Sequence, residues 1–265
     1  MKLRKIIQPK KIPIPYIVQK EQLLEGKTAF ISGGSRGIGF SIAKNFIESG
    51  AKVIISGRNE KSLIDSVKQL GENASYIVVD MRNVQSIEDM VNEIYINIEN
   101  SKDISILVNN AGSHNTNSFG STTEEQFDEV VETNIRGTYF LSQFFSNKWI
   151  ENDINGHILN ISSASAIRPG WSPYEISKSA IESLTRGMAD LLIDKGIVVN
   201  ALAPGPVATE MLGFKDDNSI YFENNPSKRV ATVDEIAQWA TYLVSDLGNY
   251  IVGSSLYITG GGGFI

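Results

Sequence analysis

A tyrosine and a lysine four residues apart, Tyr174 and Lys178, are the side chains in this sequence best placed to do chemistry. On a helix, residues four apart lie on one face, one turn from each other. A neighbouring ammonium group favours the phenolate and lowers a tyrosine pKa from its ordinary value of about 10. Such a tyrosine can exchange a proton with a substrate near neutral pH. Taken alone, the pair is more often a surface contact, so other features must distinguish the two interpretations.

A glycine-rich turn, residues 32–39, lies between a short apolar run and a segment with helical spacing that ends at Gly50. Gly33 and Gly37 allow backbone conformations that a side chain forbids, and Gly39 lets the helix lie close to the strand. The free N–H groups of the first helical turn, at the positive end of the helix dipole, favour a pyrophosphate. We therefore expect a dinucleotide site here, with an ordinary glycine-rich loop as the alternative.

Two arginines indicate which dinucleotide would bind. In a dinucleotide-binding fold, an acidic residue at the end of the second strand accepts a hydrogen bond from the 2′-hydroxyl of the adenosine ribose. Arg58 stands there instead, and Arg36 lies in the glycine turn. Two guanidinium groups can bind a 2′-phosphate through charge-assisted hydrogen bonds. This favours NADP over NAD, unless both arginines are simply solvated surface residues.

Apolar runs of strand length alternate with segments of helical spacing along the chain, which favours a doubly wound parallel sheet. The carboxyl ends of its strands should bring together Gly33, Arg58, Asp80 and Asn110. Asn134 falls in the middle of a predicted helix, where asparagine is unfavourable. Its presence there calls for an explanation beyond helix formation.

Composition narrows the class of protein. Among 265 residues there is no cysteine, which excludes disulfides and thiolate metal sites and agrees with a cytoplasmic location. No apolar run approaches the 18 residues of a membrane span. The net charge of −6 argues against general nucleic-acid binding. Residues 1–25 are basic and contain three prolines, and we interpret them as an extended N-terminal arm without signal-peptide character.

Together these motifs resemble the short-chain dehydrogenase/reductase family over residues 26–265. The cofactor turn of that family, Thr-Gly-x-x-x-Gly-x-Gly, is similar to residues 32–39, with Ser32 in place of threonine. The family's Asn-Asn-Ala-Gly, Tyr-x-x-x-Lys and Pro-Gly motifs correspond to residues 109–112, 174–178 and 204–205. The resemblance implies a single Rossmann-like α/β domain, with a doubly wound, seven-stranded parallel sheet covered by helices on both faces.

The resemblance also implies roles for individual residues. Tyr174 would protonate a substrate carbonyl oxygen while hydride arrives from the nicotinamide, and Lys178 would hold the nicotinamide ribose. Ser163 would hydrogen-bond the substrate oxygen, although it lies closer to Tyr174 than in many relatives and leaves Ser162 as an alternative. Asn134 would anchor a water in the proton relay, and no metal is required. Besides Tyr174 and Lys178, the implied cofactor contacts are Gly33, Ser35, Arg36, Gly37, Ile38, Gly39, Arg58, Asp80, Met81, Asn110, Ala111, Gly112, Pro204, Gly205, Val207 and Thr209.

The general resemblance is to 3-oxoacyl-(acyl-carrier-protein) reductases, which implies an NADP-dependent enzyme acting on a small or acyl-carrier-linked carbonyl substrate. Alternatives are a sugar or polyol dehydrogenase of the same family and a non-catalytic NADP-binding sensor or scaffold. The family also suggests a homotetramer or homodimer packed through residues 126–149 and 174–194. Substrate identity depends on loops without a readable motif. In one of them His114 could face the substrate, although an exposed loop histidine is the more common case.

Overall fold

Seven parallel strands form one sheet in the order β3-β2-β1-β4-β5-β6-β7. The computed structural model describes residues 22–97, 104–114, 119–209 and 220–262. Short apolar runs become strands because both faces of the sheet are buried. The predicted doubly wound α/β fold is confirmed. The strands are β1 (Thr28–Ser32), β2 (Lys52–Gly57), β3 (Ala74–Val78), β4 (Ile104–Asn109), β5 (Gly156–Ile161), β6 (Ile197–Pro204) and β7 (Ser255–Ile258).

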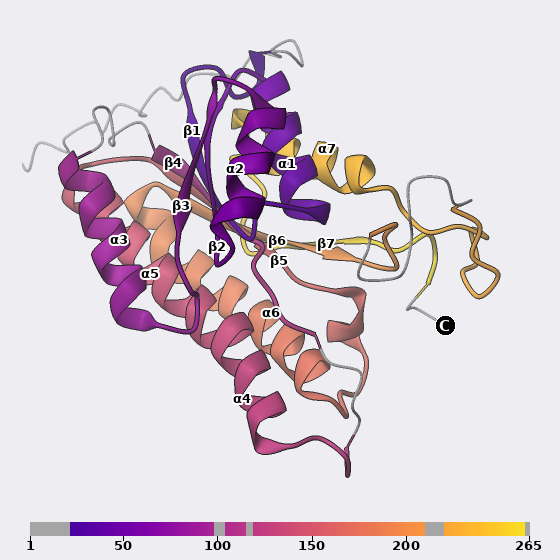
Figure 1. Ribbon diagram of the computed structural model, residues 1–265. Helices are drawn as coiled ribbons and strands as arrows, with labels where there is room; N and C mark the ends of the chain where they lie inside the picture. Colours follow the sequence, from indigo (N-terminus) through magenta and orange to yellow (C-terminus); the bar gives the residue numbers. More distant parts are fainter. Residues whose placement is uncertain (1–21, 98–103, 115–118, 210–219, 263–265) are drawn as a thin grey trace, which may run out of the picture.

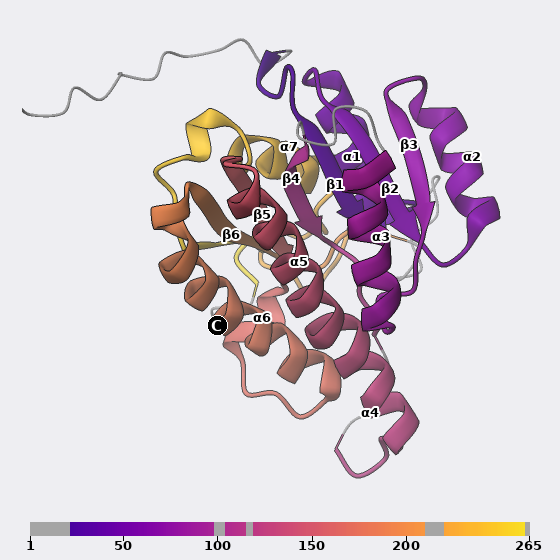
Figure 2. The same cartoon turned by 90° about the vertical axis from the view of Figure 1, so that its left-hand side faces the viewer.

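Helices cover both faces of the sheet (Figures 1 and 2). One face carries α1 (Gly37–Glu48), α2 (Glu60–Leu70) and α7 (Val233–Leu243). The other carries α3 (Val84–Asn97), α5 (Thr138–Glu151) and α6 (Pro173–Leu192), and α4 (Glu124–Val131) extends beyond the sheet. Successive strand residues point to opposite faces, so Phe30 lies in the core beneath α5 and Ile31 in the core beneath α1.

The end of the predicted N-terminal arm packs against the core of the domain. Residues 1–21 of the predicted arm lie outside the described residues. Its last part includes Leu23 and Leu24, which are buried in the core beside α1. The Leu24 N–H donates to the Ser49 carbonyl (2.9 Å), which ties this segment to the end of α1. Across the described residues, no helix has the length and apolar character needed to cross a membrane.

Candidate active site

The glycine turn between β1 and α1 forms a cradle of backbone. Gly37 has φ of +56°, a conformation that favours glycine. A Cβ at Gly39 would lie 2.4 Å from the Gly33 carbonyl oxygen, so only glycine allows this close approach. The first turn of α1 contains no acidic residue, and the Arg36 side chain does not cap it. Its N–H groups are therefore free to bind an anion, which fits the pyrophosphate of a dinucleotide.

The end of β4 is fastened to the glycine turn by two polar side chains. The Asn110 amide donates to the carbonyl oxygens of Ser32 (3.0 Å) and Gly33 (2.9 Å). In return, the Ser32 hydroxyl accepts from the N–H groups of Asn110 and Ala111, both at 3.1 Å. Ser32 thus uses the hydroxyl group that it has in common with threonine to hold the end of β4. Farther along the same turn, a Cβ at Gly112 would lie 3.9 Å from Lys178 Nζ.

The segment after β6 closes the other side of the cradle. The Gly205 N–H donates to the Ile258 carbonyl (2.9 Å), which holds this segment against β7. The Thr209 methyl group lies 3.7 Å from the position that a Cβ would take at Gly37. Thr209 therefore borders the glycine turn, as expected of a cofactor contact. The Val207 side chain instead packs into the core.

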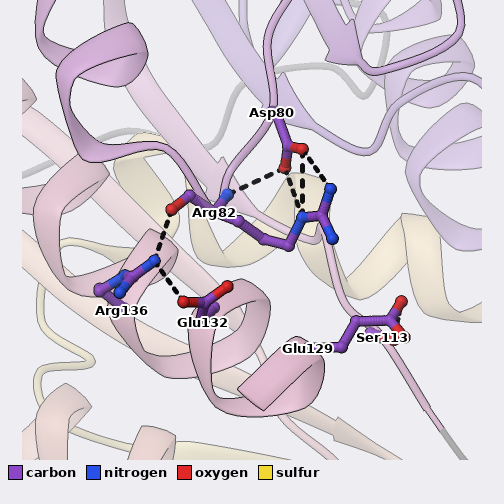
Figure 3. A network of polar contacts seen from close by, with 6 residues as sticks. All are labelled: Asp80, Arg82, Ser113, Glu129, Glu132 and Arg136. Atoms are coloured by element: carbon purple, nitrogen blue, oxygen red, sulfur yellow. Dashed lines mark hydrogen bonds and ion pairs between the residues drawn. The ribbon is translucent and has the colours of Figure 1, made fainter. Parts of the chain in front are cut away.

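Arg36 and Arg58, the two arginines expected near the adenosine, are exposed. Asp80 is paired with Arg82, a residue that the sequence analysis did not include (Figure 3). The Arg82 Nη2 lies 2.7 Å from an Asp80 carboxylate oxygen, and Nε contacts both oxygens at 3.1 Å. The hydrogen bonds from Arg82 hold the pKa of Asp80 below its ordinary value, and the charge of Arg58 also contributes. The side chain of Met81 points the other way and is buried in the core.

A π-helical turn, residues Glu132–Gly137 between α4 and α5, packs directly against this segment. Arg136 Nη2 donates to the Arg82 carbonyl (2.7 Å) and pairs with Glu132 (2.8 Å), as Figure 3 shows. A Cβ at Gly137 would lie 2.5 Å from the Met81 carbonyl oxygen. The π-turn is therefore fixed to the loop after β3. Such turns are frequent at functional sites.

The π-turn places Asn134 in the interior, where its side chain is 1% exposed. Asn134 Oδ1 accepts from the Ser113 N–H (2.7 Å), and Nδ2 donates to the Ser113 carbonyl (3.0 Å) and to Ser177 Oγ (2.9 Å). These bonds explain why an asparagine stands inside a helical segment. Both amide hydrogens are used, so a relay water would have to donate to the remaining acceptor capacity of Asn134.

The two candidate serines at the end of β5 have different surroundings. Ser162 is 3% exposed, and its hydroxyl donates to the backbone carbonyl of Lys178 at 3.4 Å. Ser163 is half-buried and caps a short 3-10 helix, where its oxygen accepts from Ser165 N–H (3.2 Å) and Ser165 Oγ (2.9 Å). Ser163 is also hydrogen-bonded to Tyr174: burial raises the pKa of that tyrosine, and this hydrogen bond offsets part of the rise. The geometry therefore favours Ser163 over Ser162 for the substrate contact.

Tyr174 and Lys178 lie in the first turns of α6, which begins with a capping box of Ser172 and Glu175. Lys178 Nζ donates to the Ile161 carbonyl (2.8 Å) and lies 5.6 Å from the centre of the Tyr174 ring. Burial lowers the pKa of Lys178 to about 8.

The expectation that Lys178 lowers the pKa of Tyr174 is wrong for this structure. Burial raises the pKa of Tyr174, and the hydrogen bond with Ser163 offsets only part of the rise. The charge of Lys178 is not among the causes of this shift, and its ammonium group donates to the Ile161 carbonyl. At neutral pH the phenol therefore keeps its proton.

Comparisons with known proteins agree with this arrangement. A family model described as enoyl-(acyl carrier protein) reductase matches residues 33–262. The 3-oxoacyl-(acyl-carrier-protein) reductase of Chlamydia trachomatis serovar D is 35% identical over 90% of this chain and 98% of its own length. Glucose 1-dehydrogenase 2 of Bacillus subtilis is 31% identical over 90% of this chain and 95% of its own length. A solved structure of a short-chain dehydrogenase/reductase family protein is 34% identical, with a TM-score of 0.80 over 91% of this chain and 99% of that one. The chain belongs to the short-chain dehydrogenase/reductase family of oxidoreductases.

Proposed function

We propose that the protein is an NADP-dependent oxidoreductase that interconverts a carbonyl and a secondary alcohol. The observation that carries this proposal is the meeting of Tyr174, Ser163 and Lys178 beside the glycine turn. Ser163 is hydrogen-bonded to Tyr174, and Lys178 lies beside the Tyr174 ring. Gly112 approaches Lys178, and Asn110 of the same turn is hydrogen-bonded to the glycine turn. A proton donor and a dinucleotide cradle at the same edge of the sheet suit a reduction.

Each residue of this group has a distinct task. When bound, the nicotinamide supplies the hydride. Tyr174 donates its proton to the carbonyl oxygen of the substrate, because its raised pKa keeps the phenol protonated at neutral pH. The Ser163 hydroxyl accepts two hydrogen bonds from Ser165 and is hydrogen-bonded to Tyr174, so a substrate oxygen that binds at Tyr174 takes the place of the phenolic oxygen as acceptor of the Ser163 proton. Lys178 holds the cofactor ribose, and its pKa near 8 suits it to pass protons near neutral pH.

The choice of NADP rests on Arg36 and Arg58. Both side chains are exposed, Arg36 in the glycine turn and Arg58 directly after β2. No acidic residue is adjacent to Arg58 to accept a hydrogen bond from a ribose hydroxyl. In a titration followed by tryptophan quenching, NADPH should bind more tightly than NADH. Changing both arginines to alanine should abolish that preference while NADH affinity changes little. A preference for NADH in the unaltered protein would contradict the assignment.

For the substrate, we propose a 3-oxoacyl group on a small molecule or an acyl carrier, on the basis of the 35% identity to the chlamydial reductase. A sugar or polyol is the second candidate, because glucose 1-dehydrogenase 2 matches over nearly the same length. Oxidation assays with NADP⁺ and sugars separate the two. A non-catalytic sensor or scaffold is disfavoured, because the tyrosine, lysine and serine are all present and close together.

Replacing Tyr174 with phenylalanine tests the catalytic assignment. The ring and its contacts remain, whereas the transferable proton is lost. We expect kcat to fall by roughly a thousandfold, within the usual contribution of a general acid. NADPH affinity should change by about twofold at most. Turnover at the level of the unaltered protein would overturn the mechanism.

We further propose that residues 26–265 act as one catalytic domain of a cytoplasmic homotetramer or homodimer. Large apolar side chains stand exposed on α4, α5 and α6, the helices through which the assembly is expected to pack. A monomer seen by sedimentation at micromolar concentration would contradict the assembly. These side chains are Phe127, Tyr139, Ile176 and Leu191.

A further inference from the structure

One exposed histidine, His114, lies against the ring of Tyr174. The ring centres are 4.7 Å apart, and the planes meet at 76°, which is an edge-on contact. Among the residues that the structure describes, the imidazole makes no hydrogen bond. A side chain that can both donate and accept a hydrogen bond therefore stands beside the proton donor with its polar atoms available to a ligand.

The backbone that carries His114 is held in place. The preceding residue, Ser113, is gripped through its N–H and its carbonyl by the Asn134 amide. The Ser113 hydroxyl also donates to Glu129 on α4 (3.0 Å); both residues are labelled in Figure 3. His114 thus projects from a fixed point next to the π-turn. A fixed donor or acceptor orients a ligand at little entropic cost.

We propose that His114 is a specificity-determining residue that hydrogen-bonds a second oxygen on the substrate, close to the reacting carbonyl. This inference rests on the proposed function, because it takes the carbonyl oxygen to lie at the Tyr174 hydroxyl. The carbon atoms next to that carbonyl then lie close to the Tyr174 hydroxyl, and His114 lies against the same ring. An oxygen on one of those carbons comes within reach of the imidazole.

Two kinds of substrate carry such an oxygen. A 1,3-dicarbonyl compound, such as a 3-oxo ester or thioester, presents an acceptor, and a hydroxy ketone presents a hydroxyl group. The imidazole is able to pair with either. A simple ketone offers neither and serves as the reference.

The alternative role for His114 is to support the Tyr174 ring by packing alone. Two variants separate the roles. His114→Phe keeps an aromatic ring against Tyr174 but loses the hydrogen bond, whereas His114→Gln keeps a hydrogen-bonding group but loses the ring. A packing role predicts that His114→Gln is the more harmful change and that all substrates suffer alike.

The experiment measures kcat/KM with NADPH for ethyl acetoacetate, hydroxyacetone and 2-hexanone in the unaltered protein and both variants. We expect His114→Phe to lower the preference for one oxygen-bearing substrate over 2-hexanone by about tenfold, the size of one lost hydrogen bond, mainly through KM. His114→Gln should restore most of that preference. Whichever substrate loses its advantage identifies the oxygen that is recognised.

An unchanged preference in His114→Phe, with 2-hexanone still reduced, overturns the role of His114 and leaves the proposed function intact. Equal losses for all three substrates do the same, because they indicate packing. If the unaltered protein reduces none of a broad set of carbonyl compounds with NADPH or NADH, the proposed function fails, and the role of His114 fails with it.

Discussion

Lys178 should make the cofactor-free protein less stable than it would be without this charge. Its side chain is 6% exposed, and burial lowers its pKa from 10.5 to about 8. At about 1.4 kcal/mol for each pKa unit, this corresponds to a cost of about 3 kcal/mol at pH 7, where the amine is charged in both states. Methionine fills similar space without a charge but leaves the Ile161 carbonyl unpaired, at a cost of about 1 kcal/mol. Lys178→Met should therefore raise the free energy of unfolding by about 2 kcal/mol.

The pH dependence of that gain identifies its cause. The lysine has a lower pKa when folded, so the unfolded chain holds more protons between pH 8 and pH 10.5. Stability conferred by the unaltered residue rises with pH through this window, and the advantage of Lys178→Met shrinks to near zero at about pH 9.5. The assay is urea unfolding without cofactor, followed by tryptophan fluorescence at pH 7 and pH 9.5.

Lys44→Met serves as the control, because Lys44 on α1 has a side chain that is 58% exposed. It should shift the free energy of unfolding by less than about 0.5 kcal/mol at either pH. The reasoning is refuted if Lys178→Met is less stable than the unaltered protein at pH 7. It is also refuted if the two proteins differ in free energy of unfolding by the same amount at pH 7 and pH 9.5. The variant should also lose turnover, since the buried charge is retained for function.

Two further predictions concern residues outside the catalytic group. Burial, and to a smaller extent the charge of Lys27, lower the pKa of His157 to about 4. Between pH 6.5 and pH 4 the unfolded chain therefore takes up a proton that the native state does not. The free energy of unfolding should fall by up to about 3 kcal/mol as the pH drops through this window. Urea unfolding at pH 7 and pH 4.5 should show a smaller loss in His157→Gln, and parallel losses would contradict it. Gly137→Ala should force the π-turn away from the Met81 carbonyl and lower kcat by about tenfold, with a smaller effect on NADPH affinity measured by titration. Gly187→Ala on α6, where a Cβ meets nothing within 4 Å, is the matched control, and equal kcat values in the two variants would refute the role of the π-turn.

The strands and the glycine turn could be predicted because their signals are local. An apolar run of strand length, a glycine that must have positive φ, and an Asn-Asn-Ala-Gly turn depend on neighbouring residues in the sequence. The order of the elements then placed them at one edge of the sheet. Asn134 in a helical segment is a local signal of the same kind, since asparagine has a poor helical propensity.

Long-range pairing was the part that the sequence did not reveal. Arg136 donates to the backbone of Arg82, 54 residues away, and no pattern marks either residue for that contact. The spacing of Arg82 and Asp80 was a signal that could have been used, because an arginine two residues after a carboxylate can fold back onto it. The predicted direction of the Tyr174 pKa shift was wrong for a related reason. Spacing along a helix predicts that two side chains are close, but the Lys178 ammonium group is oriented by its hydrogen bond to the carbonyl of Ile161, at the end of β5.

The interior beneath the site also contains polar groups where apolar packing would be expected. The Asn109 amide donates to Asn160 Oδ1 on β5 and to Ser142 Oγ on α5, both at 2.8 Å, and Asn160 donates to Thr185 Oγ1 on α6 (2.9 Å). Buried amides are costly unless they are paired, so these bonds allow few alternative registers between β4, β5 and α6. Thr185 lies two turns beyond Lys178 on the same helix. A slide of α6 that would carry Tyr174 and Lys178 away from Ser163 would break this network, so the buried amides hold the proposed catalytic residues in position.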